Sequence, residues 1–244
     1  MRLALIVMAG CGFSHGMLPN ASSDADVTGV DALDARSDAS RDGSTVTPLL
    51  VHDFEDDLIG PYTNIYLAAN DSVNHSSSVA HTGVKSAHCT SATPAEAQAT
   101  LFFNFANRTR MYTSMWIQPT AGFPPSDYVM IIAFVDDPAG SAWNNIATVA
   151  IHPDMRVSVL NTATGTYHYS SAQLTTDAWH HIEVVVLVSS TGGRLALAID
   201  GAPQFDLTGI NTGSLQFHRI LTGLVWQGAG ADPTTLYLDD VRLE

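Results

Sequence analysis

The chain has 244 residues, which is enough for one β-sandwich of ordinary size and a short extra segment. It carries 10 Lys and Arg residues against 24 Asp and Glu residues, a formal net charge of −14 at pH 7. This charge opposes binding to nucleic acids, anionic lipid surfaces and polyanionic glycans unless a cation mediates the contact. No run of about 18 apolar residues is present, so we expect no membrane-spanning helix. The charge leaves neutral ligands, or ligands bridged by calcium, as the expected binding partners.

The N-terminus has the pattern of a secretion signal. Met1-Arg2 precedes an almost wholly apolar run from Leu3 to Gly10, and Cys11 follows. The tetrapeptide Met-Ala-Gly-Cys at residues 8–11 resembles a bacterial lipobox, in which the Cys carries a lipid after cleavage. We therefore predict a lipoprotein signal peptide at residues 1–11, with Cys11 anchoring the protein to a membrane of the bacterial cell envelope, facing the periplasm or the exterior. An ordinary signal peptide of a secreted protein is the alternative.

Residues 12–48 form a segment of different composition. Six Asp residues recur there among Ser, Ala, Gly and Thr, with only two Arg residues to oppose them. Such a segment cannot bury enough apolar surface to offset its chain entropy, so we expect a disordered, acidic Asp/Ser-rich linker. The Asp-x-Asp spacings lack the Gly and the closing Glu of an EF-hand, so they do not predict a calcium loop.

From residue 49 to residue 244 the pattern is β throughout, and no amphipathic helix of useful length appears. Runs rich in β-branched and alternating apolar residues are separated by turn signals such as Asp137-Pro138 and Pro153-Asp154. Many short strands with this spacing predict an all-β fold, a two-sheet antiparallel β-sandwich of the jelly-roll type. The expected strands are Leu50–Glu55, Lys85–Thr90, Ala99–Phe105, Arg110–Gln118, Val129–Val135, Ile146–His152, Arg156–Asn161, Thr166–Ser170, Trp179–Val188, Arg194–Asp200, His218–Trp226 and Thr235–Leu243.

The stretch from Trp179 to Gly201 is the most specific indication of the architecture. Two runs of β-branched and aliphatic residues flank a loop that ends in Gly192-Gly193, and Asp200-Gly201 closes the second run. This pattern predicts a β-hairpin. The sequence pattern resembles that of the laminin-G-like and concanavalin A-like jelly rolls, in which Trp-His-His-(apolar) is followed by a Gly turn and then by Leu-x-Leu-x-(apolar)-Asp-Gly. The resemblance covers one hairpin, and it implies an architecture without specifying a ligand.

Acidic residues mark both ends of the expected domain. Asp53 to Asp57 near its start, and the run Leu-Asp-Asp-Val-Arg-Leu at its end, resemble the first and last strands of many carbohydrate-binding jelly rolls and laminin-G-like domains. Those families often place the two ends side by side and hold a structural calcium there. Calcium prefers about six to eight hard oxygen ligands, so the resemblance implies calcium at Glu55, Asp239 and Asp240. The alternative is that these acids cap strand ends in solvent.

The strand expected at residues 110–118 carries the best candidates for ligand contacts. Alternation places its Arg, Tyr, Ser, Trp and Gln residues on one face and mostly apolar residues on the other. Aromatic planes stack on pyranose rings while amide and guanidinium groups bond hydroxyls, so the stripe predicts a carbohydrate site. A core position under long loops is the alternative for its aromatic residues. An indole in the polar loop around residue 143 also suggests a partner. The predicted ligand-binding residues are Arg110, Tyr112, Trp116, Gln118 and Trp143.

Catalytic signatures are missing from the sequence. The paired-carboxylate strand of jelly-roll glucanases, the alginate-lyase motifs and a G-x-S-x-G elbow do not occur. Glu183 lacks an acidic neighbour two or four residues away on its strand face, as a glycosidase pair would require. The adjacent His180-His181 should point to opposite faces, so they cannot chelate one ion, and the resemblance implies that they are architectural. Cys89 is expected to be a buried small hydrophobe.

Three function classes remain open. The first is a surface-tethered, non-catalytic jelly-roll module that binds a carbohydrate, as a neutral or calcium-bridged glycan, or a cell-surface protein. The second is a divergent polysaccharide lyase or glycoside hydrolase on the same fold, and the third is a structural envelope lipoprotein. The glycan part of the first class rests on fold analogy alone.

Overall fold

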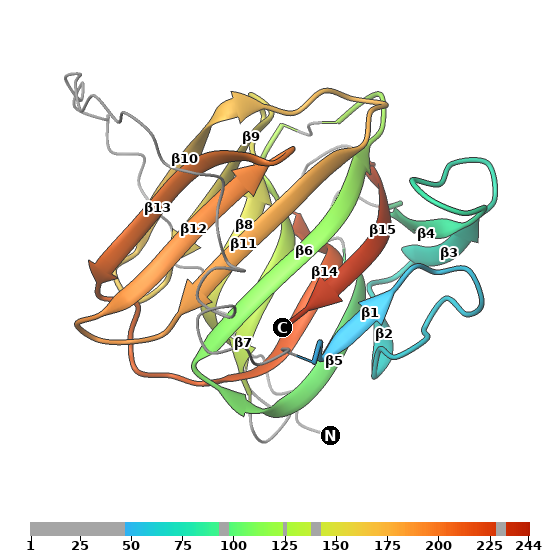
Figure 1. Cartoon of the computed structure of the whole chain (residues 1–244). Coiled ribbons are helices and arrows are strands. Elements are labelled where there is room, and N and C mark those ends of the chain that lie inside the picture. The colour runs from blue at the N-terminus through green and yellow to red at the C-terminus, as the bar shows by residue number, and fades with distance from the viewer. Residues whose placement is uncertain (1–46, 93–97, 124–125, 138–142, 228–232) are drawn as a thin grey trace, which may run out of the picture. The chain divides into compact units, whose positions relative to one another are not determined.

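Two antiparallel sheets pack face to face in the computed structural model, which describes residues 47–92, 98–123, 126–137, 143–227 and 233–244 (Figure 1). The chain divides into units of residues 1–30 and 31–244, and all described residues belong to the second unit. The predicted signal peptide, Cys11 and residues 12–46 of the predicted linker lie outside the described residues. No helix in the described part of the chain is long and apolar enough to cross a membrane.

The first sheet, called sheet I below, has the strand order β13-β12-β11-β6-β15-β4-β3, and β1 also pairs with β15. All of its pairings are antiparallel. Its strands are β1 (Leu50–His52), β3 (Ser72–Ser76), β4 (Ser86–Thr90), β6 (Arg110–Pro119), β11 (His180–Leu187), β12 (Gly193–Ile199), β13 (Ala202–Ile210) and β15 (Thr235–Leu243).

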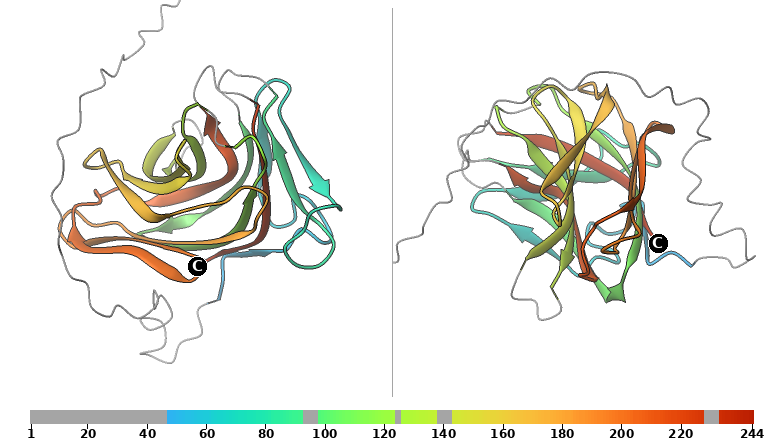
Figure 2. Two further views of the ribbon diagram at one scale, coloured as in Figure 1. Left: turned by 90° about the horizontal axis from the view of Figure 1, so that it is seen from above. Right: turned by 90° about the vertical axis from the view of Figure 1, so that its left-hand side faces the viewer.

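The second sheet, sheet II, has the order β10-β9-β8-β7-β14-β5-β2 and is antiparallel throughout. The two sheets form the two layers seen end-on in Figure 2. Its strands are β2 (Asn64–Leu67), β5 (Ala99–Arg108), β7 (Val129–Asp136), β8 (Asn144–Ile151), β9 (Arg156–Asn161), β10 (Thr166–Gln173) and β14 (Phe217–Gln227).

Alternating side chains of both sheets fill a single core between the layers. On β6 and β11 the inward residues Met115, Ile117 and Ile182 are fully buried, and Ile131 and Ile220 face them from sheet II. Cys89 belongs to the same core, and burial raises the pKa of its thiol to about 12. The predicted all-β, two-sheet antiparallel sandwich is therefore confirmed, and the structure contains no helix among the described residues.

Twelve of the fifteen strands that the described residues form were expected, with ends that differ by a few residues. The expected hairpin forms between β11 and β12, and Asp200 and Gly201, both at positive φ, make the turn from β12 to β13. The three strands not expected, β2, β3 and β13, lie at or beside sheet edges and expose many of their side chains. Such strands lack the apolar alternation by which buried strands are recognised.

Candidate ligand-binding surfaces

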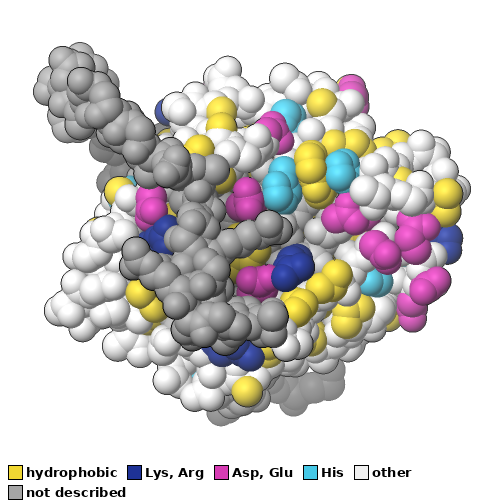
Figure 3. Space-filling view, in the orientation of Figure 1, with side chains coloured by type: hydrophobic (Ala, Val, Ile, Leu, Met, Phe, Trp, Pro, Cys, Tyr) yellow, Lys and Arg dark blue, Asp and Glu magenta, His cyan; other side chains and the backbone are white. Residues whose placement is uncertain are grey.

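The β6 residues predicted to bind ligand all lie on the outward face of sheet I. The residues between them on the strand point into the core and are buried, so the alternation expected from the sequence is confirmed. Figure 3 looks onto this face and shows histidine, acidic and hydrophobic side chains lying next to one another. The outward set consists of the exposed Arg110 and the half-buried Tyr112, Trp116 and Gln118.

The indole of Trp116 is flanked by two imidazoles. His181 of the neighbouring β11 stacks on it with a centroid separation of 4.9 Å, and His81 stacks on it at 3.7 Å. The His81 ring in turn bonds Asp240 of β15 at 2.7 Å. Because β11 and β15 are the two neighbours of β6, the imidazoles approach Trp116 from two sides. The ring surface that would stack on a sugar is thus already in contact with side chains of the protein.

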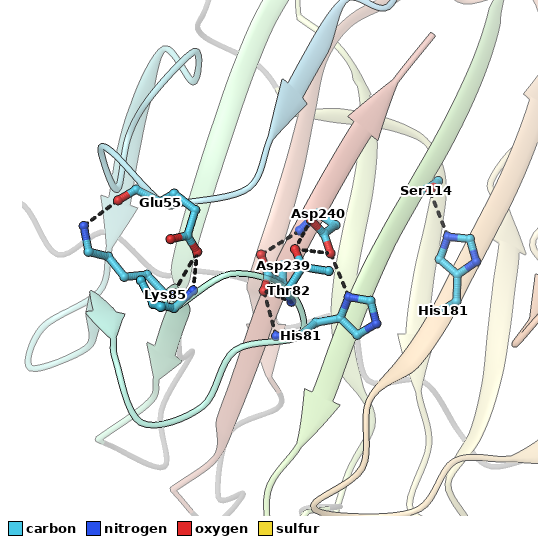
Figure 4. Close-up of polar contacts among 9 residues, drawn as sticks. Glu55, His81, Thr82, Lys85, Ser114, His181, Asp239 and Asp240 are labelled. Atoms are coloured by element: carbon cyan, nitrogen blue, oxygen red, sulfur yellow. Dashed lines mark hydrogen bonds and ion pairs between the residues drawn. The ribbon is translucent and has the colours of Figure 1, made fainter.

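Next to Trp116, four outward side chains form a chain of polar contacts. The Tyr112 hydroxyl donates to Glu183 Oε1 at 2.8 Å, and Glu183 Oε2 lies 3.7 Å from His181 Nδ1. The other ring nitrogen of His181 lies 2.9 Å from Ser114 Oγ (Figure 4). Burial, and then the Glu183 carboxylate, raise the pKa of Tyr112 well above its usual range. The phenol therefore stays a donor at ordinary pH.

The three acids predicted to hold calcium instead accept hydrogen bonds from one loop, residues 81–85 (Figure 4). Asp239 Oδ2 accepts from the backbone N–H groups of His81 at 2.8 Å and Thr82 at 3.3 Å. Asp240 accepts from the Thr82 hydroxyl and bonds the His81 ring. Glu55 Oε1 accepts from the backbone N–H groups of Val84 at 2.8 Å and Lys85 at 2.9 Å.

A β-bulge in β15 places both aspartates against the same loop. The register with β6 shifts between Asp239 and Arg242, and Asp240 adopts a positive φ of 47°. Asp239 is fully buried, and this burial raises its pKa from 3.8 to about 6.

Among the described residues no group of three or more His, Cys, Asp or Glu side chains is arranged to hold a metal ion. The carboxylate oxygens of Glu55, Asp239 and Asp240 accept hydrogen bonds from N–H and O–H groups, so few of these oxygens are free to coordinate a cation. These hydrogen bonds do not fit the oxygen-rich shell that calcium prefers, so we expect no calcium at these residues, against the prediction from the sequence.

The adjacent histidines of β11 behave as the sequence indicated. His180 is turned to the buried side, where its Nδ1 bonds Asp200 at 2.8 Å and its Nε2 accepts from the Thr175 N–H at 3.0 Å. His180 thereby connects the turn between β12 and β13, and the segment before β11, to the sheet. His181 lies on the other face, so the pair does not converge on one ion.

The fifth predicted residue, Trp143, is not part of the β6 stripe. It precedes β8 of sheet II and packs edge-to-face on Tyr66 of β2, with a centroid separation of 5.5 Å. The two rings are 42% and 46% exposed, so each still presents surface to solvent. The five predicted residues are therefore divided between the two sheets.

The structure also gathers aromatic rings that the sequence did not single out, on the outward side of sheet II. Tyr128 contacts Trp226 at 5.2 Å and His152 at 5.7 Å between centroids, and His152 contacts Tyr169 at 4.8 Å. Tyr167 lies 6.1 Å from both His152 and Tyr169. We call these five residues the ring row. Tyr167 and Tyr169 are 37% and 41% exposed, so they form its open end.

Strand register explains why the ring row forms. Val129 at the start of β7 pairs with Ile151 at the end of β8 and with Gln227 at the end of β14. Residues next to these three paired positions therefore meet at one end of the sheet. The sequence did contain a signal, since Tyr167 and Tyr169 alternate in an expected strand, but the pairing of four strands cannot be read from composition.

The electrostatics of the ring row are set mainly by burial. Burial lowers the pKa of His152 below its usual 6.5, although the neighbouring Asp154 opposes this. Burial also raises the pKa of Tyr128 to about 12. His152 Nε2 lies 2.7 Å from Ser158 Oγ, which fixes the ring. At neutral pH the row thus presents uncharged rings and hydroxyl groups.

One cation lies over the open end of the ring row. The Arg156 guanidinium carbon lies 4.9 Å from the Tyr169 ring centroid, while its Nε donates to Asp154 at 2.6 Å. The arginine is therefore already paired with an acid of the same turn. The combination of exposed phenols, an imidazole and a guanidinium can stack on a pyranose ring and bond its hydroxyls.

Comparison with solved structures identifies the fold. Over 81% of this chain and 95% of the other, the structure matches the endo-β-1,4-glucuronan lyase of the fungus Trichoderma reesei, with a TM-score of 0.64 and 13% identity. It matches a cellulose-induced protein named Cip1 over 80% and 96% of the two chains, with a TM-score of 0.62 and 13% identity. An alginate lyase matches over 80% and 93%, with a TM-score of 0.51 and 11% identity.

These identities establish a shared jelly-roll sandwich and nothing finer. No protein-family model matches the chain, and no curated protein matches it in sequence.

Proposed function

We propose that this protein is a carbohydrate-binding jelly-roll module and that its glycan site is the ring row of sheet II. The observation that carries the proposal is the exposure of Tyr167 and Tyr169 beside His152 and Arg156 on an outward sheet face. Exposed aromatic rings next to polar groups are what a sugar-stacking surface requires. The structural similarity to proteins named as polysaccharide lyases supports a carbohydrate role by analogy of fold.

The chemistry of the row favours a neutral glycan. The single guanidinium in contact with the row is paired with Asp154, and the chain as a whole carries a charge of −14. A polyanionic glycan would meet unfavourable long-range electrostatics unless a cation mediated the contact.

Titration calorimetry against neutral oligosaccharides selected on a glycan array tests the proposal. Tyr169→Ala should weaken binding at least about tenfold, which corresponds to about 1.4 kcal/mol, and should leave the fold intact. Tyr66→Ala is the matched control, because it removes an exposed tyrosine from the opposite edge strand of the same sheet. Unchanged affinity in Tyr169→Ala, or absence of any glycan ligand, would reject the ring row as the site.

The β6 stripe of Arg110, Tyr112, Trp116 and Gln118 is the competing glycan site. Its residue types suit a sugar, but Trp116 has imidazoles against its ring and Tyr112 has its hydroxyl on Glu183. If glycan binding were lost in Gln118→Ala and kept in Tyr169→Ala, the site would be this stripe.

A polysaccharide lyase is the second candidate function, and His152 favours it. Burial holds this imidazole neutral at pH 7, with two phenols, Tyr128 and Tyr169, in contact with the ring. A neutral base and a nearby phenolic acid can together remove and donate the protons of a β-elimination. Incubation with polyuronates should then produce an unsaturated sugar that absorbs ultraviolet light, and His152→Gln should abolish it. If no absorbing product forms, the lyase candidate is rejected.

Envelope anchoring through Cys11 is a separate part of the proposal. The lipobox resemblance at residues 8–11 supports lipidation of Cys11 and a membrane-anchored place in the bacterial cell envelope. Cys11→Ala should release the protein from the membrane fraction of a bacterial host. A wild-type protein that is already soluble would contradict this part alone. That the domain is laminin-G-like is also a proposal, and it is supported by the sequence pattern of residues 179–201.

A further inference from the structure

Three outward side chains of sheet I have the connectivity of a nucleophilic serine site. Ser114 Oγ lies 2.9 Å from His181 Nε2, and His181 Nδ1 lies 3.7 Å from Glu183 Oε2. Nucleophile, base and acid in this order define a Ser–His–acid arrangement by geometry and not by position in the sequence. We propose that this cluster hydrolyses esters of small acids, with Ser114 as the nucleophile and His181 as the general base. The proposal is independent of the glycan site on sheet II.

The strand pairing explains how the three groups meet. Ser114 on β6 is the direct cross-strand partner of Glu183 on β11, and His181 lies two residues before Glu183 on the same face. Figure 4 shows the contact between Ser114 and His181. Directly opposed side chains of neighbouring strands are about 5 Å apart at Cβ, which is the reach of one imidazole bridge. A regular antiparallel pair of strands therefore holds this arrangement without a special loop.

Glu183 and His181 each have a second contact that restricts their position. The Tyr112 hydroxyl occupies Glu183 Oε1 and leaves Oε2 toward His181, and the Trp116 indole stacks on the imidazole. In the proposal Glu183 is a positioning residue, which orients the imidazole so that Nε2 faces Ser114 Oγ. The 3.7 Å separation is longer than a hydrogen bond, as is common for catalytic contacts before a substrate binds.

A second serine–histidine pair in the same molecule shows what is special about the first. On sheet II, Ser158 Oγ lies 2.7 Å from His152 Nε2. Within the described residues no ion pair joins His152 to a carboxylate, and Ser158 is fully buried. Ser114 has both the histidine and the acid, and it keeps 8% of its surface exposed. Reactivity should therefore distinguish Ser114 from Ser158.

The remaining requirement is a donor for the oxyanion. Ser114 pairs with Arg242 of β15 on its other side, and Arg242 is exposed. The Arg242 guanidinium donates to Glu244 Oε1 at 2.6 Å, and in this proposal it turns from that carboxylate to stabilise the developing negative charge. The limited exposure of Ser114 restricts the acyl group to a small one such as acetyl. The negative charge of the chain favours an uncharged ester.

The reaction balances without a cofactor. Ser114 Oγ attacks the ester carbonyl as its proton passes to His181 Nε2, and the tetrahedral intermediate collapses by breaking the bond to the alcohol oxygen. His181 gives that oxygen the proton, so the alcohol leaves and an acyl-Ser114 ester remains. Water then attacks this ester with His181 again taking a proton, which releases the acid and restores Ser114.

A fluorophosphonate probe, followed by peptide mass spectrometry, tests the proposal on the wild-type chain. We expect one adduct on Ser114 and none on Ser158. Hydrolysis of 4-nitrophenyl acetate should be lost in Ser114→Ala and His181→Gln and reduced about tenfold in Glu183→Gln. The wild-type rate should rise with pH as one group loses its proton, and the pH at which it rises should differ in Glu183→Gln, which keeps a measurable rate.

Ser171→Ala is the matched control, because Ser171 is an exposed serine whose hydroxyl bonds Gln204 and no histidine. Its hydrolysis rate should equal that of the wild type. Melting curves confirm that each variant is folded. The labelling of the unmodified chain does not depend on any variant, so a wild-type protein without an adduct on Ser114 would overturn the proposal. Equal hydrolysis by Ser114→Ala would do the same.

Discussion

The outward faces of the two sheets use similar residue types in opposite ways. On sheet I, Trp116 is flanked by His81 and His181, and nearby acids are bonded to backbone or side-chain donors. On sheet II, Tyr167 and Tyr169 keep more than a third of their surface in solvent. Polar partners on sheet I hold a loop and a strand pair in place. The rings on sheet II retain free surface.

The difference shows that composition alone does not identify a ligand surface. A stripe of Arg, Tyr, Trp and Gln suits a sugar only if the aromatic faces are free, and a ring already stacked on an imidazole offers less surface. Free surface depends on which loops and strands lie beside the stripe. We therefore expect loss of the Trp116 ring on sheet I to affect mainly stability and substitutions at the open end of the ring row to affect mainly glycan binding.

The largest expected effect is loss of stability in Trp116→Ala. Removing the indole leaves His81 and His181 without their stacking partner and frees the loop that follows residue 80. A large aromatic side chain packed in this way contributes about 3–5 kcal/mol to the free energy of unfolding, measured by urea denaturation. Trp143→Ala is the control and should cost less than about 1 kcal/mol, since its ring is 42% exposed. Equal losses of unfolding free energy in the two variants would contradict the proposed difference between Trp116 and Trp143.

The second effect is the pH dependence caused by Asp239. Its carboxyl has a folded-state pKa raised from 3.8 to about 6 by burial, so the folded state binds this proton more tightly than the unfolded state. This contribution to stability is present below about pH 4 and is lost as the pH rises through about 6, a change of about 3 kcal/mol. Comparing the free energies of unfolding of the wild type and Asp239→Asn between pH 4 and pH 7 measures it. A relative stability that rises with pH would instead indicate a bound cation.

A smaller effect of opposite sign is expected at His152 on sheet II. Burial lowers the folded-state pKa of this imidazole, so the folded state prefers the neutral ring. Its contribution to stability is present above about pH 6.5 and is lost as the pH falls through the folded-state value. Denaturation of the wild type and His152→Gln at pH 7 and pH 5 gives the difference. If the two proteins lose stability in parallel, His152 is not the group responsible.

The smallest expected effect is that of calcium removal. Glu55, Asp239 and Asp240 already accept N–H or O–H groups of the residue 81–85 loop, so millimolar calcium should not stabilise the folded state. The melting temperature should agree in calcium and in EDTA. A higher melting temperature in calcium would show binding to the folded state and restore these acids as ligands.

The sequence predicts much of the fold because buried strands carry their own pattern. The alternation on β6 and the Asp200-Gly201 turn between β12 and β13 both follow from side-chain period and turn chemistry. Edge strands such as β3 were not predicted, because many of their side chains face solvent and their sequences therefore lack a regular alternation of apolar residues. The surfaces were harder to predict, because the His81–Trp116 stack and the ring row depend on loops and register between distant segments.

The account depends on the claim that a glycan contacts sheet II and not the β6 stripe. Chemical-shift mapping of the isotope-labelled protein, titrated with a neutral oligosaccharide that binds on an array, compares both faces in a single experiment. We predict that the largest amide shifts fall on residues 128–130, 152–158 and 167–170, with β6 and β11 unchanged. Shifts concentrated at residues 110–118 and 181–183 would contradict the account and place the ligand on sheet I.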